Sequence, residues 1–232
     1  MGAQWKHAVR QASANAKGRV FTKLAKDIII AARGGADPTM NARLRAAVEA
    51  ARKQSMPRDS IERAVKKGAG LLDETVTYEN VTYEGFAPHR VPVIVECLTD
   101  NKNRTATNIR QLFRKGQLGS SGSVSWDFAH LGMIDATPPE GADAEEAAIE
   151  AGAQDFEPDG EGGFHFYTEP TDLDAVSKAL SGRGWIVASM KIGWRAKNPM
   201  KIDDEAARTE INAFLAEIDA DDDVQTLYVG LQ

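Results

Sequence analysis

The sequence predicts an α+β protein whose first third is helical and whose remainder alternates strands with helices. Apolar residues recur at helical spacing as far as Gly68, whereas from Val76 they follow the two-residue alternation that is typical of strands. With 232 residues and 42% hydrophobic content, the chain is long enough for one large domain or two to three small ones with buried cores.

Three helices with narrow apolar stripes are predicted in the first segment of the chain, residues 1–70. The first helix covers residues 16–33 and ends at a Gly-Gly pair, which stops helices readily. The second covers residues 42–54 and follows Asn41, a residue type that caps helix N-termini through its side-chain oxygen. The third covers residues 57–68, and Pro57 suits its first turn. We expect these short helices to pack into a small bundle.

Charged residues in these helices are spaced for local interactions. Asp59 and Glu62 have the three-residue spacing of a capping box at the start of the third helix. Glu62 also lies four residues before Lys66, and Arg45 lies four residues before Glu49, which are the spacings of helical ion pairs. Such pairs contribute only roughly 0.2–0.5 kcal/mol each. They do not explain why basic residues outnumber acidic ones in this segment.

From residue 76 onward the predicted elements alternate between strands and helices. Residues 76–86 alternate polar and apolar side chains, and residues 91–98 form an apolar run of the kind that is buried on both faces of a sheet. Residues 99–116 are expected to form a polar turn and a helix, with Thr105 or Thr107 as its N-cap. The other predicted strands cover residues 123–128, 131–136, 162–170, 185–194 and 224–231, and the other predicted helices cover residues 143–153, 171–184 and 203–219.

Sequence motifs for catalysis and for metal binding are missing. The single cysteine, Cys97, excludes an internal disulfide and a zinc site built from several cysteines, and its apolar surroundings predict a buried, unreactive thiol. The four histidines are scattered, and no phosphate-binding loop, dinucleotide fingerprint or nucleophile elbow occurs. We therefore expect no cofactor, no metal ion and no enzymatic activity.

The sequence also gives no sign of a membrane segment. No stretch approaches the roughly 18 apolar residues that a spanning helix needs, and the N-terminus lacks the apolar core of a secretory signal. The expectation is a cytoplasmic protein without a membrane partner.

Charge is distributed very unevenly along the chain. Residues 1–70 contain 15 Lys and Arg against 5 Asp and Glu, residues 71–130 contain 6 against 7, and residues 131–232 contain 7 against 22. A basic segment joined to an acidic one suggests a nucleic-acid partner, which would offset the self-repulsion of the cations. The alternative for the basic segment is a solvated helical surface. For the acidic segment the alternatives are solubility and electrostatic restraint of the basic one.

The expected nucleic-acid contacts lie in two places. The loop of residues 99–105 carries polar side chains at the end of a predicted buried strand, where they either cap the next helix or contact phosphate and sugar oxygens. The first segment supplies the basic side chains. The full set is Lys6, Arg10, Lys17, Arg19, Lys23, Lys26, Arg43, Arg45, Arg52, Lys53, Arg58, Arg63, Lys66, Lys67, Asn101, Lys102, Asn103 and Arg104.

Several motifs, in order along the chain, closely resemble those of the YebC/PmpR family. That family includes transcriptional regulators and the mitochondrial translational activator of cytochrome oxidase. The chain departs from it at Gly2-Ala3-Gln4-Trp5 and at Ala87-Pro88-His89-Arg90, which suggests a divergent paralogue. The matching motifs are FTKL (21–24), AARGGADP (31–38), NARLRAA (41–47), MPRDSIERAVKKGAG (56–70), YEGF (83–86), VECLTDNKNRT (95–105) and SGSVSWDF (121–128).

The resemblance implies an N-terminal three-helix domain followed by two small α/β domains around a cleft, the third inserted into the second. The implied bounds are residues 1–75 for the basic three-helix domain, 76–130 plus 204–232 for the middle domain, and 131–203 for the acidic domain. It also implies a DNA-binding transcriptional regulator or, alternatively, a ribosome-associated translation factor that binds rRNA or tRNA and relieves stalls at proline-rich sequences. Phosphate contacts do not distinguish these partners, and the oligomeric state is not predicted.

Overall fold

The computed structural model describes residues 4–72 and 77–232, without the side chains of residues 4–16 and of Ala42. The chain forms two compact units. The first unit comprises Met1–Ser123 with Ile202–Leu227, and the second unit comprises Val124–Lys201 with Tyr228–Gln232. Within the described residues, three helices come first along the chain, and strands interleaved with four further helices then form two sheets of mainly antiparallel pairs, which confirms the predicted α+β class.

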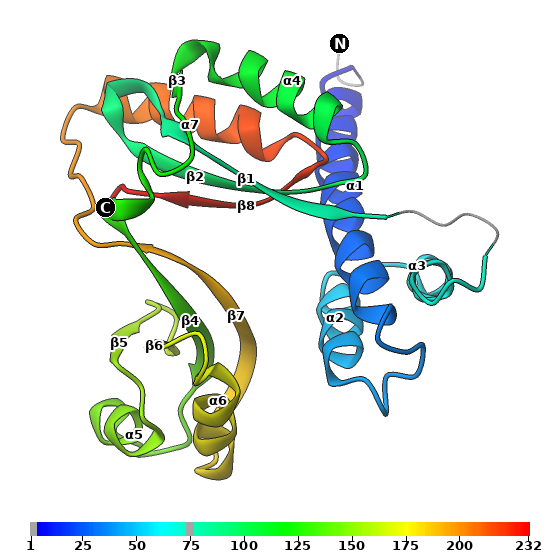
Figure 1. The fold of residues 1–232 in the computed structure, drawn as a ribbon, viewed down its shortest axis with the longest axis vertical. Helices are drawn as coiled ribbons and strands as arrows, with labels where there is room; N and C mark the ends of the chain where they lie inside the picture. Colours follow the sequence, from blue (N-terminus) through cyan, green and yellow to red (C-terminus); the bar gives the residue numbers. More distant parts are fainter. Residues whose placement is uncertain (1–3, 73–76) are drawn as a thin grey trace. The chain divides into compact units, whose positions relative to one another are not determined.

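Three helices open the first unit, as predicted (Figure 1). They are α1 (Gln4–Ala32), which begins earlier than predicted, α2 (Ala42–Lys53) and α3 (Arg58–Gly68). The predicted N-cap is confirmed, since Asn41 Oδ1 accepts a hydrogen bond from the Leu44 amide at 3.0 Å. Its Nδ2 donates to the Ala31 carbonyl at 2.7 Å, so one side chain links the end of α1 to the start of α2.

The start of α3 differs from the prediction. Its N-cap residue is Pro57, without a capping side chain, so the capping box of Asp59 and Glu62 is wrong. Glu62 instead accepts a hydrogen bond from Arg58 Nε at 2.7 Å. Arg58 lies four residues before Glu62, and Lys66 lies four residues after it, so the helical spacing allows either pair. The structure has the pair with Arg58 in place of the predicted pair with Lys66.

A four-stranded sheet with the order β3-β1-β2-β8 completes the first unit. Strand β2 is almost wholly buried, as its apolar run predicts. The helices α4 and α7 lie over one face of this sheet (Figure 1). The elements are β1 (Glu79–Phe86), η1 (Pro88–Arg90), β2 (Pro92–Thr99), α4 (Lys102–Leu112), η2 (Phe113–Lys115), β3 (Gln117–Leu118), α7 (Glu205–Asp219) and β8 (Val224–Val229).

The turn between β1 and β2 is strained. His89 and Arg90 have φ angles of 61° and 62°, in the left-handed region that costs non-glycine residues roughly 1–2 kcal/mol. Both belong to the segment Ala87-Pro88-His89-Arg90, which departs from the motifs that the rest of the chain resembles. His89 Nε2 lies 2.9 Å from Glu210 Oε2, a contact that helps to hold this turn against α7.

The second unit contains a sheet with the order β5-β6-β4-β7, covered by two helices. Ile134, Phe166 and Leu180 are fully buried between the sheet and these helices. The short strand β5 was not predicted. The elements are η3 (Ser125–Asp127), β4 (Phe128–Thr137), α5 (Ala144–Ala151), β5 (Asp155–Pro158), β6 (Phe164–Thr168), α6 (Leu173–Gly182) and β7 (Ile186–Ala196).

The strand predicted at residues 123–128 is wrong. Residues Ser125–Asp127 form a short 3₁₀ turn, and the strand begins only at Phe128. Val124 and Phe128 are both buried, four residues apart, whereas Trp126 between them is 69% exposed. The apolar residues that suggested a strand are therefore two buried side chains, Val124 and Phe128, on either side of a turn.

Cys97 is buried on β2, as predicted. Burial, together with the nearby Asp221 and Asp223 carboxylates, raises its pKa to about 12. Because the thiolate is the reactive form, we expect Ellman's reagent at pH 8 to leave the native thiol intact and to titrate it in denaturant. A Ser120→Cys variant, which places a second thiol at an exposed position, serves as the reactive control. Rapid reaction of the native wild-type protein would contradict this expectation.

Candidate nucleic-acid interface

The outer surface of α2 and α3 is cationic. The two helices bury a narrow stripe that includes Leu44 and Ile61 in the core they share with α1. The sides of α2 and α3 that remain in solvent carry basic residues. These exposed residues are Arg43, Arg45, Arg52, Lys53, Arg58, Arg63 and Lys66.

Acidic residues neutralise little of this surface. Arg58 is paired with Glu62, and both side chains are at least half exposed. Within the described part of the chain, none of the other six exposed cations forms an ion pair. Arg45 does not bind Glu49, although their spacing would allow it. Arg43 lies close enough to Asp27 for its charge to lower the pKa of that carboxyl, but neither it nor the other five forms an ion pair with a described residue. These helices therefore present concentrated positive charge with little local neutralisation.

The basic residues of α1 have different surroundings. Lys17 and Arg19 are exposed, whereas Lys23 Nζ forms an ion pair with Asp219 at 2.6 Å. Lys67 of α3 is half-buried and is held by contacts of its own. The predicted contacts Lys6 and Arg10 lie in helix α1, but their side chains are outside the described residues.

Lys26 lies in the interior of the first unit rather than on its surface. It is only 5% exposed, and its Nζ donates to the Leu98 carbonyl at 2.9 Å and to the Asp222 carbonyl at 2.6 Å. A third bond, of 2.9 Å, goes to Asp223 Oδ1. All three ammonium protons are used, so Lys26 holds α1 to the first sheet and has none left for a phosphate.

Asp223 is the centre of this buried polar cluster, and sequence reasoning missed it. Besides Lys26, it accepts hydrogen bonds from Arg104 Nη2 at 2.9 Å and from Thr105 Oγ1 at 2.8 Å. Burial opposes ionisation of the carboxyl, but these hydrogen bonds outweigh it and hold the pKa of Asp223 below its ordinary value. In the sequence, Asp223 is one of four aspartates at 219–223, and nothing local distinguishes it from the other three.

The loop before α4 is organised mainly by its own contacts. The N-cap of α4 is Asn101, whose Oδ1 accepts from the Arg104 amide at 3.1 Å, so the predicted caps Thr105 and Thr107 are wrong. Lys102 forms an ion pair with Glu79, and Arg104 is paired with Asp100 as well as with Asp223. Asn103 is exposed. The two cations of this loop thus already have carboxylate partners.

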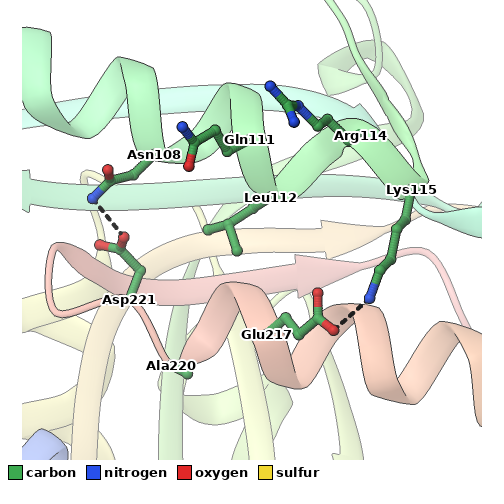
Figure 2. Close-up of a pocket in the computed structure, with 8 residues that line it drawn as sticks. All are labelled: Asn108, Gln111, Leu112, Arg114, Lys115, Glu217, Ala220 and Asp221. Atoms are coloured by element: carbon green, nitrogen blue, oxygen red, sulfur yellow. Dashed lines mark hydrogen bonds and ion pairs between the residues drawn. The ribbon is translucent and has the colours of Figure 1, made fainter.

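A groove runs between α4 and α7, and its lining is of mixed charge (Figure 2). Asn108 Nδ2 reaches Asp221 Oδ2 at 3.0 Å at one end, and Lys115 Nζ reaches Glu217 Oε1 at 2.5 Å at the other. These contacts tie the two helices together. Its two basic lining residues, Arg114 and Lys115, are matched by the two acidic ones, Glu217 and Asp221, so the groove as a whole has no excess of positive charge.

Family models match nearly the whole chain. The TACO1/YebC protein N-terminal domain matches residues 2–71, and the TACO1/YebC second and third domain matches residues 78–231. The chain belongs to the TACO1/YebC family. The resemblance seen in its motifs is thereby confirmed.

Individual relatives agree with this assignment. The chain is 63% identical over 233 residues to a protein from Pseudomonas syringae pv. tomato and 48% identical over 234 residues to one from Bdellovibrio bacteriovorus. These alignments cover 100% of this chain and 99% and 100% of the relatives, which are both named "Probable transcriptional regulatory protein". The crystal structure of a conserved hypothetical protein from Aquifex aeolicus is similar in fold, with a TM-score of 0.79 and 40% identity over 93% of this chain and 90% of that one.

Proposed function

We propose that this protein is a regulator that binds nucleic acid through the exposed cations of α2 and α3. The observation that carries the proposal is the set of six exposed Lys and Arg side chains without ion-pair partners among the described residues. Positive charge concentrated in this way binds a phosphate backbone because each contact releases condensed counterions. The names of the relatives favour DNA as the physiological target.

The proposal predicts that binding depends on these cations and on salt. Substituting Arg45, Arg52, Arg63 and Lys66 together with Gln removes four exposed charges and no ion pair. The slope of log K against log salt should become shallower by about 2 to 4, since each lost phosphate contact accounts for about 0.9. Affinity for duplexes of different sequence should fall to a similar extent, because phosphate contacts carry no sequence information.

Fluorescence anisotropy with a labelled 20-base-pair DNA and a hairpin RNA of equal length provides the measurement. A charge-matched control replaces four cations of the second unit with Gln: Lys178, Arg183, Lys191 and Lys197. The control should keep the wild-type slope. If both variants change the slope equally, the interface is not on α2 and α3. Tighter binding of the RNA by tenfold or more would overturn the assignment to DNA.

Across residues 4–72 and 77–232, no helix is long and apolar enough to cross a bilayer.

A further inference from the structure

A second cationic surface lies on α4, outside the three-helix segment. Residues 102–115, which form α4 and η2, contain five basic residues and no acidic residue. Three of the five are used by the fold: Lys102 pairs with Glu79, Arg104 with Asp223, and Lys115 with Glu217.

The other two, Arg110 and Arg114, are exposed and form no ion pair with any described residue. They are four residues apart, which puts them on the same side of the helix, about 6 Å from each other along its axis. Glu217 of α7 lines the same groove as Arg114, but it is already bound to Lys115 (Figure 2). The fold therefore uses three of the five cations in ion pairs and leaves these two exposed, without an ion pair to a described residue.

Polar side chains extend this pair into a continuous stripe. Thr105, Ile109 and Phe113 are buried and direct one side of the helix to the first unit's interior. The opposite side is exposed and has no apolar residue, and its spacing follows the helical repeat. The stripe consists of Asn103, Thr107, Arg110, Gln111 and Arg114.

We propose that this α4 stripe is a second contact surface for the sugar–phosphate backbone of a nucleic acid. Arg, Asn, Gln and Thr are residue types that bind phosphate and sugar oxygens. From Asn103 to Arg114 the stripe is about 16 Å long, which corresponds to roughly five nucleotide steps along one strand. A protein partner fits less well, because the centres of protein interfaces are apolar and rich in aromatic residues.

This inference rests on the proposed function but uses different residues, so the two are tested separately. In the double variant Arg110→Gln and Arg114→Gln, DNA binding should weaken roughly tenfold near 0.1 M salt, and the salt slope should become shallower by about 2. The matched control, Lys102→Gln with Lys115→Gln, removes the same charge from the same helical segment but from cations that are already paired. The control should keep the wild-type slope.

Thermal unfolding of both double variants checks that the fold is intact, and changes within about 0.5 kcal/mol are expected for such surface positions. If the two double variants change DNA affinity and the salt slope equally, the effect comes from the overall charge of the protein and not from contacts of Arg110 and Arg114. That result would overturn the proposed α4 surface. An unchanged slope in the Arg110 and Arg114 variant, with a reduced slope in the α2–α3 variant, overturns it too and leaves the proposed function standing.

Other outcomes separate the two proposals further. If only the Arg110 and Arg114 variant changes binding, the proposal of an α4 surface is supported and the placement of the interface on α2 and α3 is overturned. If the wild-type protein binds neither the DNA nor the RNA, both fall. If a poly-glutamate peptide of about 20 residues displaces the DNA at equal charge concentration, the surface recognises acidic polypeptides and the assignment to nucleic acid is overturned.

Discussion

Replacing Asp223 with Ala is expected to lower the free energy of unfolding by about 3–5 kcal/mol, because it leaves a buried ammonium group without its counter-charge. The Lys26 and Asp223 side chains are only 7% and 6% exposed, and their charged atoms are 2.9 Å apart. Arg104 and Thr105 would lose an acceptor at the same time. Since these groups connect α1, α4 and the start of β8, the loss should affect the whole first unit.

Urea denaturation followed by circular dichroism measures this effect, and the neighbouring acid supplies the control. Asp222 is exposed and its side chain makes no described contact, so Asp222→Ala removes the same charge while keeping the backbone carbonyl that binds Lys26. It should change stability by no more than about 0.5 kcal/mol. Similar midpoints for the two variants would show that the buried cluster is not a main support of the fold.

The same cluster predicts how stability depends on pH. The folded pKa of Asp223 lies below its ordinary value of 3.8. A carboxyl with a lowered folded pKa stabilises the protein fully above its unfolded pKa and loses that contribution as the pH falls through the folded value. The difference in unfolding free energy between wild type and Asp223→Ala should therefore be constant from pH 5 to 7 and shrink below about pH 4. A difference that grows on acidification would contradict the assigned charge state.

Most of the helices and strands could be predicted because each depends on a local apolar period. The buried run at 91–98 and the Asn41 cap show this, since both follow from neighbouring residues alone. The 3₁₀ turn around Trp126 could not be predicted, because the tertiary fold decides which of the neighbouring apolar side chains are buried. Val124 and Phe128 are buried, whereas Trp126 is exposed. The early start of α1 was missed because its first residues carry no clear apolar stripe.

The candidate interface was predictable in composition but not in detail. Charge counting finds the excess of Lys and Arg, but the pairing of each side chain depends on residues far away in the sequence. Lys26 is held by an acid 197 residues later, and Lys102 and Arg104 are likewise paired by the folded chain. Conversely, the sequence pattern did not single out Arg110 and Arg114. They are distinguished only in the structure, where the other three cations of the same segment form ion pairs.

At Gly68, α3 packs tightly against α1. A Cβ atom built on Gly68 would lie 2.2 Å from the carbonyl oxygen of Ile29 and 2.8 Å from the Cβ atom of Ala32. The obstacle is largely backbone, which cannot move aside as a flexible side chain can. Residue 68 needs no left-handed conformation, so the steric contact alone explains why glycine is required here.

Gly68→Ala should therefore destabilise the packing of α3 on α1 by about 1–3 kcal/mol, even though alanine is the better helix former. Gly18→Ala is the matched control: this glycine lies within α1 and has open space around it, so alanine should stabilise the protein by up to about 1 kcal/mol. Urea midpoints for the two variants should thus move in opposite directions. In Gly68→Ala, amide exchange should speed up in α3, because separating the helices exposes Ile61 and Ala64, which are buried there. A Gly68→Ala protein as stable as Gly18→Ala would mean that α1 and α3 are not in close contact in solution.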